Sequence, residues 1–160
     1  MAKIERSIDV YVPLSTAYNQ WTQFEEFPQF MQAVKSVRQV DDTTLEWTAE
    51  IAGRERSWTA EIYEQEPDQS IAWRSTTGEQ NSGRVSFEEI GPQHTKVMLV
   101  MEWQPEGAIE AAGEALGFDD RQVEGDLERF KEFIEGRGHE TGGWRGEVVG
   151  GVVGGVERSG

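Results

Sequence analysis

One stretch near the carboxyl end of the chain restricts the fold more than any other, because its apolar residues recur with the spacing of a helix. They are separated by steps of three, four and seven residues, which places them on one face of an α-helix. These residues are Leu116, Val123, Leu127, Phe130 and Ile134. Asp119 or Asp120 suits the beginning of this helix, and Gly136 or Gly138 suits its end. A helix of about 18 residues is about 27 Å long, which is enough to cross a small β-sheet.

One glycine, Gly125, lies inside this predicted helix. A glycine in a helix interior costs roughly 1 kcal/mol relative to alanine. Two interpretations stay open: Gly125 allows a strand or a ligand to approach the helix closely, or the glycine is simply tolerated.

Most of the chain before this helix has the pattern of β-strands. Between residues 37 and 104, short segments alternate apolar and polar residues with the period of two that is typical of half-buried strands. Turn-forming sequences such as Gly91-Pro92 separate these segments. A further strand is predicted over residues 4–12, and two short helices follow Pro13. We therefore predict an α+β fold in which a curved antiparallel sheet of about seven strands wraps around the long helix.

Large aromatic residues fall on one face of this predicted sheet. They are Trp47, Trp58, Trp73, Phe87 and Trp103. Each ring either fills the core between sheet and helix or lines a hollow, and apolar hollows with a few polar groups are the usual ligand sites. Neighbouring residues of a regular strand point to opposite faces. Hydrophobicity therefore favours Trp73 pointing inward and Arg74 pointing outward.

Composition argues against several classes of function. The net charge of −15 opposes binding to nucleic acid or to an anionic membrane surface. No apolar run approaches the roughly 18 residues of a membrane span. The absence of cysteine excludes disulfides and thiolate sites and suits a cytoplasmic location. The two histidines lack the spacing of metal ligands, and no nucleotide-binding motif is present, so we expect neither a metal nor a cofactor.

The character of the chain changes after Arg137. Half of the 18 glycines lie beyond this residue, and a Val-Val-Gly-Gly sequence occurs twice. Such a segment buries little apolar surface, so we predict a domain over residues 1–136 followed by a flexible tail over residues 137–160. The alternative is a valine-rich strand that adds to the edge of a sheet.

Several short motifs, spread over residues 3 to about 136, are similar to those of one known superfamily. They are Val12-Pro13, Trp21, Phe27-Pro28-Gln29-Phe30-Met31, Val34, Val37, Ile71-Ala72-Trp73-Arg74-Ser75, Gly83-Arg84-Val85-Ser86-Phe87, Thr95-Lys96-Val97, Pro105-Glu106-Gly107 and Leu127-Glu128-Arg129-Phe130-Lys131. With the predicted order of elements, the chain resembles the START-like superfamily, also called SRPBCC, and within it the polyketide cyclase/dehydrase group. The resemblance implies a helix-grip fold with a deep, largely hydrophobic cavity between the sheet and the long helix.

The resemblance also implies a function, because members bind lipids, sterols, quinones, plant hormones or polyketides. We predict that this chain binds a hydrophobic or aromatic small molecule in the cavity. The residues expected to contact it are Phe27, Phe30, Met31, Trp47, Ile51, Trp58, Ile62, Trp73, Ser75, Phe87, Leu99, Met101, Trp103, Val123, Leu127 and Phe130.

Two alternative functions stay open. The first is a polyketide aromatase/cyclase or dehydrase that acts on a chain held by an acyl carrier protein. Arg74 matches an arginine position of such enzymes, and Arg74 with Tyr63 or Tyr18 would position the chain and transfer protons. The second is a protein-interaction module, and a homo-oligomer is compatible with either. Two ionisable groups meeting in the cavity would favour the enzyme, a purely apolar cavity would favour the binding protein, and a cavity filled by rings would favour the interaction module.

Overall fold

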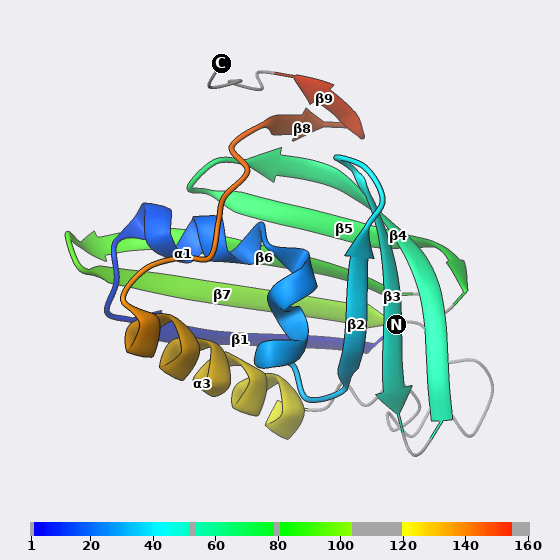
Figure 1. Cartoon of the computed structure of the whole chain (residues 1–160), viewed down its shortest axis with the longest axis horizontal. Coiled ribbons are helices and arrows are strands. Elements are labelled where there is room, and N and C mark those ends of the chain that lie inside the picture. Colours follow the sequence, from blue (N-terminus) through cyan, green and yellow to red (C-terminus); the bar gives the residue numbers. More distant parts are fainter. Residues whose placement is uncertain (1, 52–53, 79–80, 104–119, 155–160) are drawn as a thin grey trace.

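The computed structural model describes residues 2–51, 54–78, 81–103 and 120–154, and its elements follow the predicted order (Figure 1). The elements are β1 (Ala2–Val10), α1 (Leu14–Trp21), the 3₁₀ helix η1 (Phe24–Gln29), β2 (Val34–Gln39), β3 (Thr44–Ile51), β4 (Arg54–Glu66), β5 (Ser70–Gly78), β6 (Asn81–Gly91), β7 (His94–Trp103), α3 (Asp120–Arg137), β8 (Glu147–Val149) and β9 (Val152–Gly154).

The strands form one antiparallel sheet in the order β1-β7-β6-β5-β4-β3-β2. These seven strands are the predicted ones, and β8 and β9 extend the sheet to nine. The sheet is curved, and α1, η1 and α3 all lie on the same side of it (Figure 1). Register shifts in β4, between Thr59 and Ala60 and between Ile62 and Glu64, mark irregularities of the kind that bend a strand. The predicted helix-grip architecture is confirmed.

The long helix α3 presents the predicted apolar face to the sheet. Val123, Leu127, Phe130 and Ile134 are all buried, whereas Glu124, Glu128 and Glu132 are exposed. The helix spans 18 residues, as the spacing indicated. The predicted start at Leu116 lies outside the described residues. Among the helices that the structure describes, none is long and apolar enough to cross a membrane.

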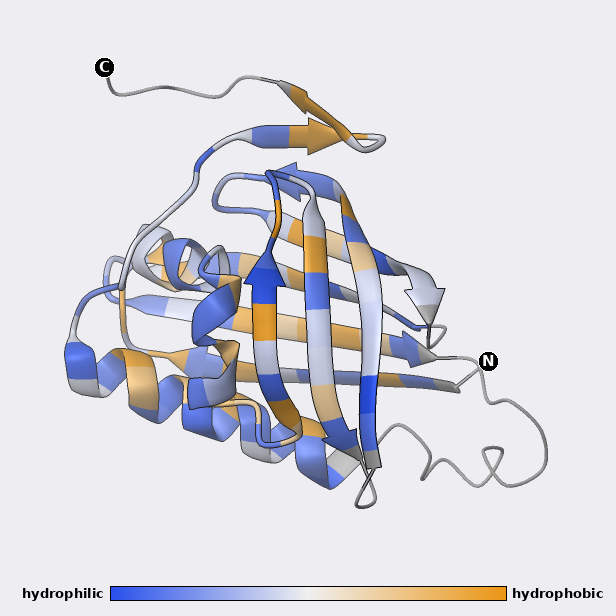
Figure 2. Ribbon diagram, turned by 45° about the vertical axis from the view of Figure 1, so that its right-hand side comes forward, coloured by the Kyte–Doolittle hydropathy of each residue, from blue (hydrophilic) through white to orange (hydrophobic). Residues whose placement is uncertain are grey.

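Aromatic rings from α1 and η1 pack against one another and against α3 in the core. The rings of Trp21 and Phe27 meet edge to face with centroids 5.3 Å apart, and Trp21 lies 5.1 Å from Phe130 of α3. Such arrangements stabilise a core beyond the burial of area alone. Hydrophobic and hydrophilic residues alternate along the strands (Figure 2). The part of the core between α1, η1 and α3 is therefore filled by aromatic rings.

The chain after α3 crosses α1 before it rejoins the sheet (Figure 1). Thr141 exchanges two hydrogen bonds with the fully buried Gln20: the Gln20 amide donates to Thr141 Oγ1 at 3.0 Å, and the Thr141 N–H donates to Gln20 Oε1 at 2.9 Å. Further on, Arg145 donates to Asn19 Oδ1 at 2.8 Å and to Asp68 Oδ2 at 2.7 Å. These polar contacts fix the segment on the domain.

Beyond these contacts, β8 pairs with β4 at Glu64 and Gln65, and β9 pairs with β8. Two glycines with positive φ, Gly150 at 58° and Gly151 at 82°, form the turn between β8 and β9. The structure thus places residues 138–154 against the domain, and the alternative of a valine-rich strand at a sheet edge describes β8 and β9, whereas residues 155–160 of the predicted tail lie outside the described residues. A few polar side chains anchor a segment that has little apolar surface of its own.

Candidate functional site

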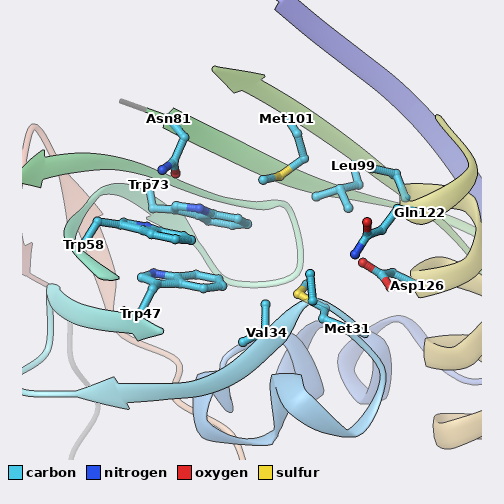
Figure 3. A pocket seen from close by; sticks show the side chains of 12 residues that line it. Met31, Val34, Trp47, Trp58, Trp73, Asn81, Leu99, Met101, Gln122 and Asp126 are labelled. Carbon is cyan, nitrogen blue, oxygen red and sulfur yellow. The ribbon is translucent and has the colours of Figure 1, made fainter. Parts of the chain in front are cut away.

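A small cavity lies between the inner face of the sheet and the amino-terminal half of α3 (Figure 3). Its volume is about 30 Å³, room for about two water molecules. The described lining residues are Met31, Ala33, Val34, Trp47, Trp58, Trp73, Asn81, Leu99, Met101, Gln122, Val123 and Asp126. Most of these side chains are apolar, so the cavity suits an apolar molecule.

Three tryptophans from adjacent strands form one wall of this cavity. Trp47 of β3 and Trp58 of β4 are directly paired in the sheet, and their rings stack at 5.8 Å with planes 10° apart. Trp73 of β5 lies 6.2 Å from Trp47 with planes 25° apart. Figure 3 shows the three indoles as nearly parallel plates. Alternation along each strand places all three on the inner face, where the edges of the stacked rings border the cavity.

Gly83 provides the space that Trp73 occupies. The two residues are paired between β5 and β6. A Cβ atom on Gly83 would lie 2.5 Å from Cζ2 and 2.6 Å from Cε2 of Trp73, much closer than the 3.5–4.0 Å of an ordinary carbon contact. The absence of a side chain at Gly83 therefore sets the position of the Trp73 ring.

A few polar groups border the apolar lining. Gln122 and Asp126 extend from α3 and point toward one another, whereas Asn81 comes from β6 on the tryptophan side (Figure 3). The indole N–H groups of Trp47 and Trp58 are buried, and neither has a hydrogen-bond acceptor within the described parts of the chain. Buried donors without a partner are costly.

Asp126 differs from the other polar lining residues because it is ionisable and largely buried. Burial raises the pKa of its carboxyl group, against the opposing effect of hydrogen bonds from the Gln32 N–H and the Arg129 guanidinium. It is the one ionisable residue among the described residues that line the cavity.

Comparison with known proteins agrees with this arrangement. Residues 10–132 match the family model described as polyketide cyclase / dehydrase and lipid transport. The chain belongs to this family. A relative from Streptomyces lincolnensis, an uncharacterised 17.2 kDa protein of the melC2-rnhH intergenic region, is 52% identical over 150 residues, which are 93% of this chain and 100% of the relative.

Two solved structures have a fold similar to that of this family member. The Zhui aromatase/cyclase of Streptomyces sp. R1128 superposes with a TM-score of 0.70 at 16% identity, over 89% of this chain and 98% of that one. A START superfamily protein from Mycobacterium smegmatis superposes with a TM-score of 0.65 at 17% identity, over 84% of this chain and 95% of that one. These likenesses show the fold, and the family match confirms the predicted polyketide cyclase/dehydrase group.

Part of the set of residues predicted to contact a ligand lines the cavity in this family member. These residues are Met31, Trp47, Trp58, Trp73, Leu99, Met101 and Val123. A second group is buried in the core but does not line the cavity: Phe27, Phe30, Ile62, Phe87, Leu127 and Phe130. Ser75 adjoins the cavity indirectly, since its hydroxyl accepts the N–H of Asn81 at 3.1 Å. The side chains of Ile51 and Trp103 lie outside the described residues.

The predicted catalytic residues Arg74 and Tyr63 lie together, but on the outer face of the sheet. Arg74 is exposed, and its guanidinium carbon lies 4.9 Å from the centroid of the Tyr63 ring. With Trp73 pointing inward, strand alternation turns Arg74 outward, and the register shift after Ile62 places Tyr63 beside it. Neither side chain lines the cavity, so the predicted pair is misplaced for chemistry on a ligand bound there.

Tyr63 instead lines a separate, solvent-open hollow of about 220 Å³ on the outer face. Its described lining also includes Lys3, Ser82, Arg84 and Glu102. Arg84 is already paired with Glu64, at 2.6 Å. The hollow is polar and exposed, in contrast to the apolar cavity on the inner face.

Some lining residues were not predicted. They are Ala33, Val34, Asn81, Gln122 and Asp126. Asp126 follows Val123 by three residues and so lies one turn away on the same side of α3, a spacing that could have indicated it. The asparagine and the glutamine had no sequence signal, because isolated amides occur throughout solvated surfaces.

Proposed function

We propose that this protein binds a hydrophobic or aromatic small molecule, such as a lipid, a quinone or a polyketide-like compound, in the cavity. The observation that carries the proposal is the wall formed by Trp47, Trp58 and Trp73, whose inner edges border an apolar space. A flat molecule would gain ring-edge contacts and burial there.

Binding requires the cavity to widen. A cavity that accommodates benzene measures about 150 Å³, whereas this one measures about 30 Å³. Met31 and Met101 both line the space, and unbranched methionine side chains change conformation easily. Movement of these side chains and of the segment that carries Met31 would provide room.

The alternative function is a polyketide cyclase or dehydrase. Asp126 is the observation that favours it, because a buried carboxyl with a raised pKa holds its proton more readily than a solvated one, as a general acid does. It acts without a second ionisable group among the described lining residues, which makes the binding protein the better supported function. For the enzyme, the partner would be an acyl carrier protein. In either case we propose a cytoplasmic protein, in line with its lack of cysteine, and a homo-oligomer remains part of the proposal.

Native mass spectrometry of protein purified without detergent tests the binding function. The wild type should carry a small molecule, or acquire one from a panel of apolar compounds, and denaturing extraction identifies its class. Val123→Phe adds a ring inside the cavity and should abolish the bound mass. Glu128→Phe adds the same ring on the solvent side of α3 and should leave the bound mass unchanged. A wild type that stays free of every compound would contradict the proposal and favour an interaction module.

A further inference from the structure

We propose that Asp126, oriented by Arg129, is a latch that holds residues 31–34 closed over the cavity, and that the ligand passes between this segment and α3. The inference rests on the proposed function, since it specifies how a ligand reaches the same cavity. It concerns access to the site, which neither the family description nor the fold assigns to any residue.

The walls of the cavity differ in how firmly they are held. The tryptophan wall is carried by β3, β4 and β5, and each of these strands pairs with a strand on both sides. The segment from Met31 to Val34 instead lies between η1 and β2, outside regular pairing for most of its length. Because the cavity must widen, the lining segment that is not held between two neighbouring strands is the one expected to move.

Both ends of this segment are fixed, which makes it a hinged flap. At one end, the buried Phe30 packs its ring 5.2 Å from Phe130 and 5.6 Å from Trp21. At the other end, the Glu50 N–H donates to the Ala33 carbonyl at 2.8 Å, and a register shift follows between Val34 and Ser36. The flap can therefore move away from α3 while it stays attached to the sheet.

Two side chains of α3 make polar contacts here, one with the flap itself and one with its fixed end at Phe30. The Gln32 N–H donates to Asp126 Oδ1 at 3.1 Å, and Arg129 Nε donates to the Phe30 carbonyl at 2.9 Å. Asp126 and Arg129 also pair with each other, three residues apart on α3. Asp126 thus holds the flap, while Arg129 orients Asp126 and holds the fixed end, as charge-assisted hydrogen bonds do. Asp126 lines the cavity as well, so the latch lies at the boundary that a ligand has to cross.

Gly125 gives the latch its room. A Cβ atom on Gly125 would lie 3.1 Å from Nη1 and 3.3 Å from Nη2 of Arg129, so the guanidinium folds back along the helix over the glycine. This position lets Arg129 reach both Asp126 and the Phe30 carbonyl. The nearest atoms to an added Cβ belong to Arg129 of the same helix, so the structure does not show the close approach of a strand or a ligand that was one of the two interpretations of this glycine.

Stopped-flow fluorescence with N-phenyl-1-naphthylamine, a neutral apolar probe, tests the latch. Asp126→Ala and Arg129→Gln should each raise the rates of probe association and dissociation by roughly tenfold or more, the factor expected when a charge-assisted hydrogen bond is lost. Glu128→Gln removes a charge from the exposed side of the same helix and should change neither rate. Unchanged rates in folded Asp126→Ala and Arg129→Gln proteins would overturn the latch while leaving the binding function intact.

A second measurement examines the latch without any ligand. Hydrogen exchange at the Gln32 amide should be slow in the wild type, because this N–H donates to Asp126. Exchange should accelerate by roughly tenfold or more in Asp126→Ala and in Arg129→Gln, and it should stay slow in Glu128→Gln. If the wild type bound no probe, accelerated exchange in the two variants would still support the latch, whereas equal exchange in all proteins would overturn it.

Discussion

Replacing Gly83 by alanine should disturb the tryptophan wall directly. The added Cβ would lie 2.5 Å from Cζ2 and 3.0 Å from Nε1 of Trp73. Carbon atoms in contact are about 3.5–4.0 Å apart, so the indole must move by about 1 Å or more. Trp73 borders the cavity on its other side, and the volume available there is about 30 Å³. The ring can therefore relax only by occupying part of the ligand space or by tilting away from Trp47.

Two effects of opposite sign decide the change in the free energy of unfolding. Overpacking a core costs about 1–3 kcal/mol, while replacing a strand glycine relieves about 0.5–1 kcal/mol of backbone entropy. The clash is with a ring held between neighbours, so overpacking dominates. We expect a net destabilisation of about 1–2 kcal/mol, which lowers the melting temperature by about 2–8 °C in a domain of this size.

Urea denaturation measures the change in stability, and titration with N-phenyl-1-naphthylamine measures the change in affinity. Gly91→Ala is a matched control in the same strand, since its Cβ would meet nothing closer than the His94 Cβ at 3.8 Å. Gly83→Ala should lose both stability and affinity, and Gly91→Ala should lose neither. A Gly83→Ala protein with the stability and affinity of the wild type would refute the reasoning that Gly83 positions Trp73.

Other predictions concern pH, the segment after α3 and the outer face. Burial raises the pKa of Tyr18 to about 12. Because the unfolded chain loses this proton already near pH 10, the free energy of unfolding should fall by about 2–3 kcal/mol between pH 10 and 12. Urea denaturation should show a flatter decline for Tyr18→Phe. Gln20→Ala leaves the Thr141 N–H without its acceptor and should cost about 1–3 kcal/mol, whereas Gln32→Ala, which keeps its backbone N–H, should cost little; equal melting temperatures would contradict the anchoring. Arg74→Ala should leave probe affinity within about twofold, because Arg74 lies on the outer face; a large loss would restore it as a site residue.

Periodicity in the sequence was enough to predict the face of the sheet that carries the rings. Trp47, Trp58 and Trp73 alternate with polar neighbours, and the spacing of α3 indicated the side that would cover them. The same alternation already opposed an inward Arg74. Transferring a catalytic arginine from the resemblance conflicted with this local pattern, and the structure agrees with the pattern.

The rest of the site depends on tertiary contacts that periodicity cannot encode. Asp126 lies beside the apolar stripe of α3, and only the position of the Gln32 backbone decides that it faces inward and not toward solvent. The role of Gly83 depends on its pairing with Trp73 across two strands. In the segment after α3, the partner of Thr141 is Gln20, more than a hundred residues earlier in the chain. Composition within that segment gave no indication of such an anchor.

The most direct test of ligand binding at the tryptophan wall is a ¹H–¹⁵N correlation spectrum of the indole N–H groups, recorded with and without N-phenyl-1-naphthylamine. Single Trp→Phe variants assign the signals. Because Trp47, Trp58 and Trp73 line the cavity and Trp21 and Trp144 do not, the first three signals should shift and the last two should remain in place. Shifts confined to Trp144, or no shift in a protein that binds the probe, would place the ligand elsewhere and contradict the account.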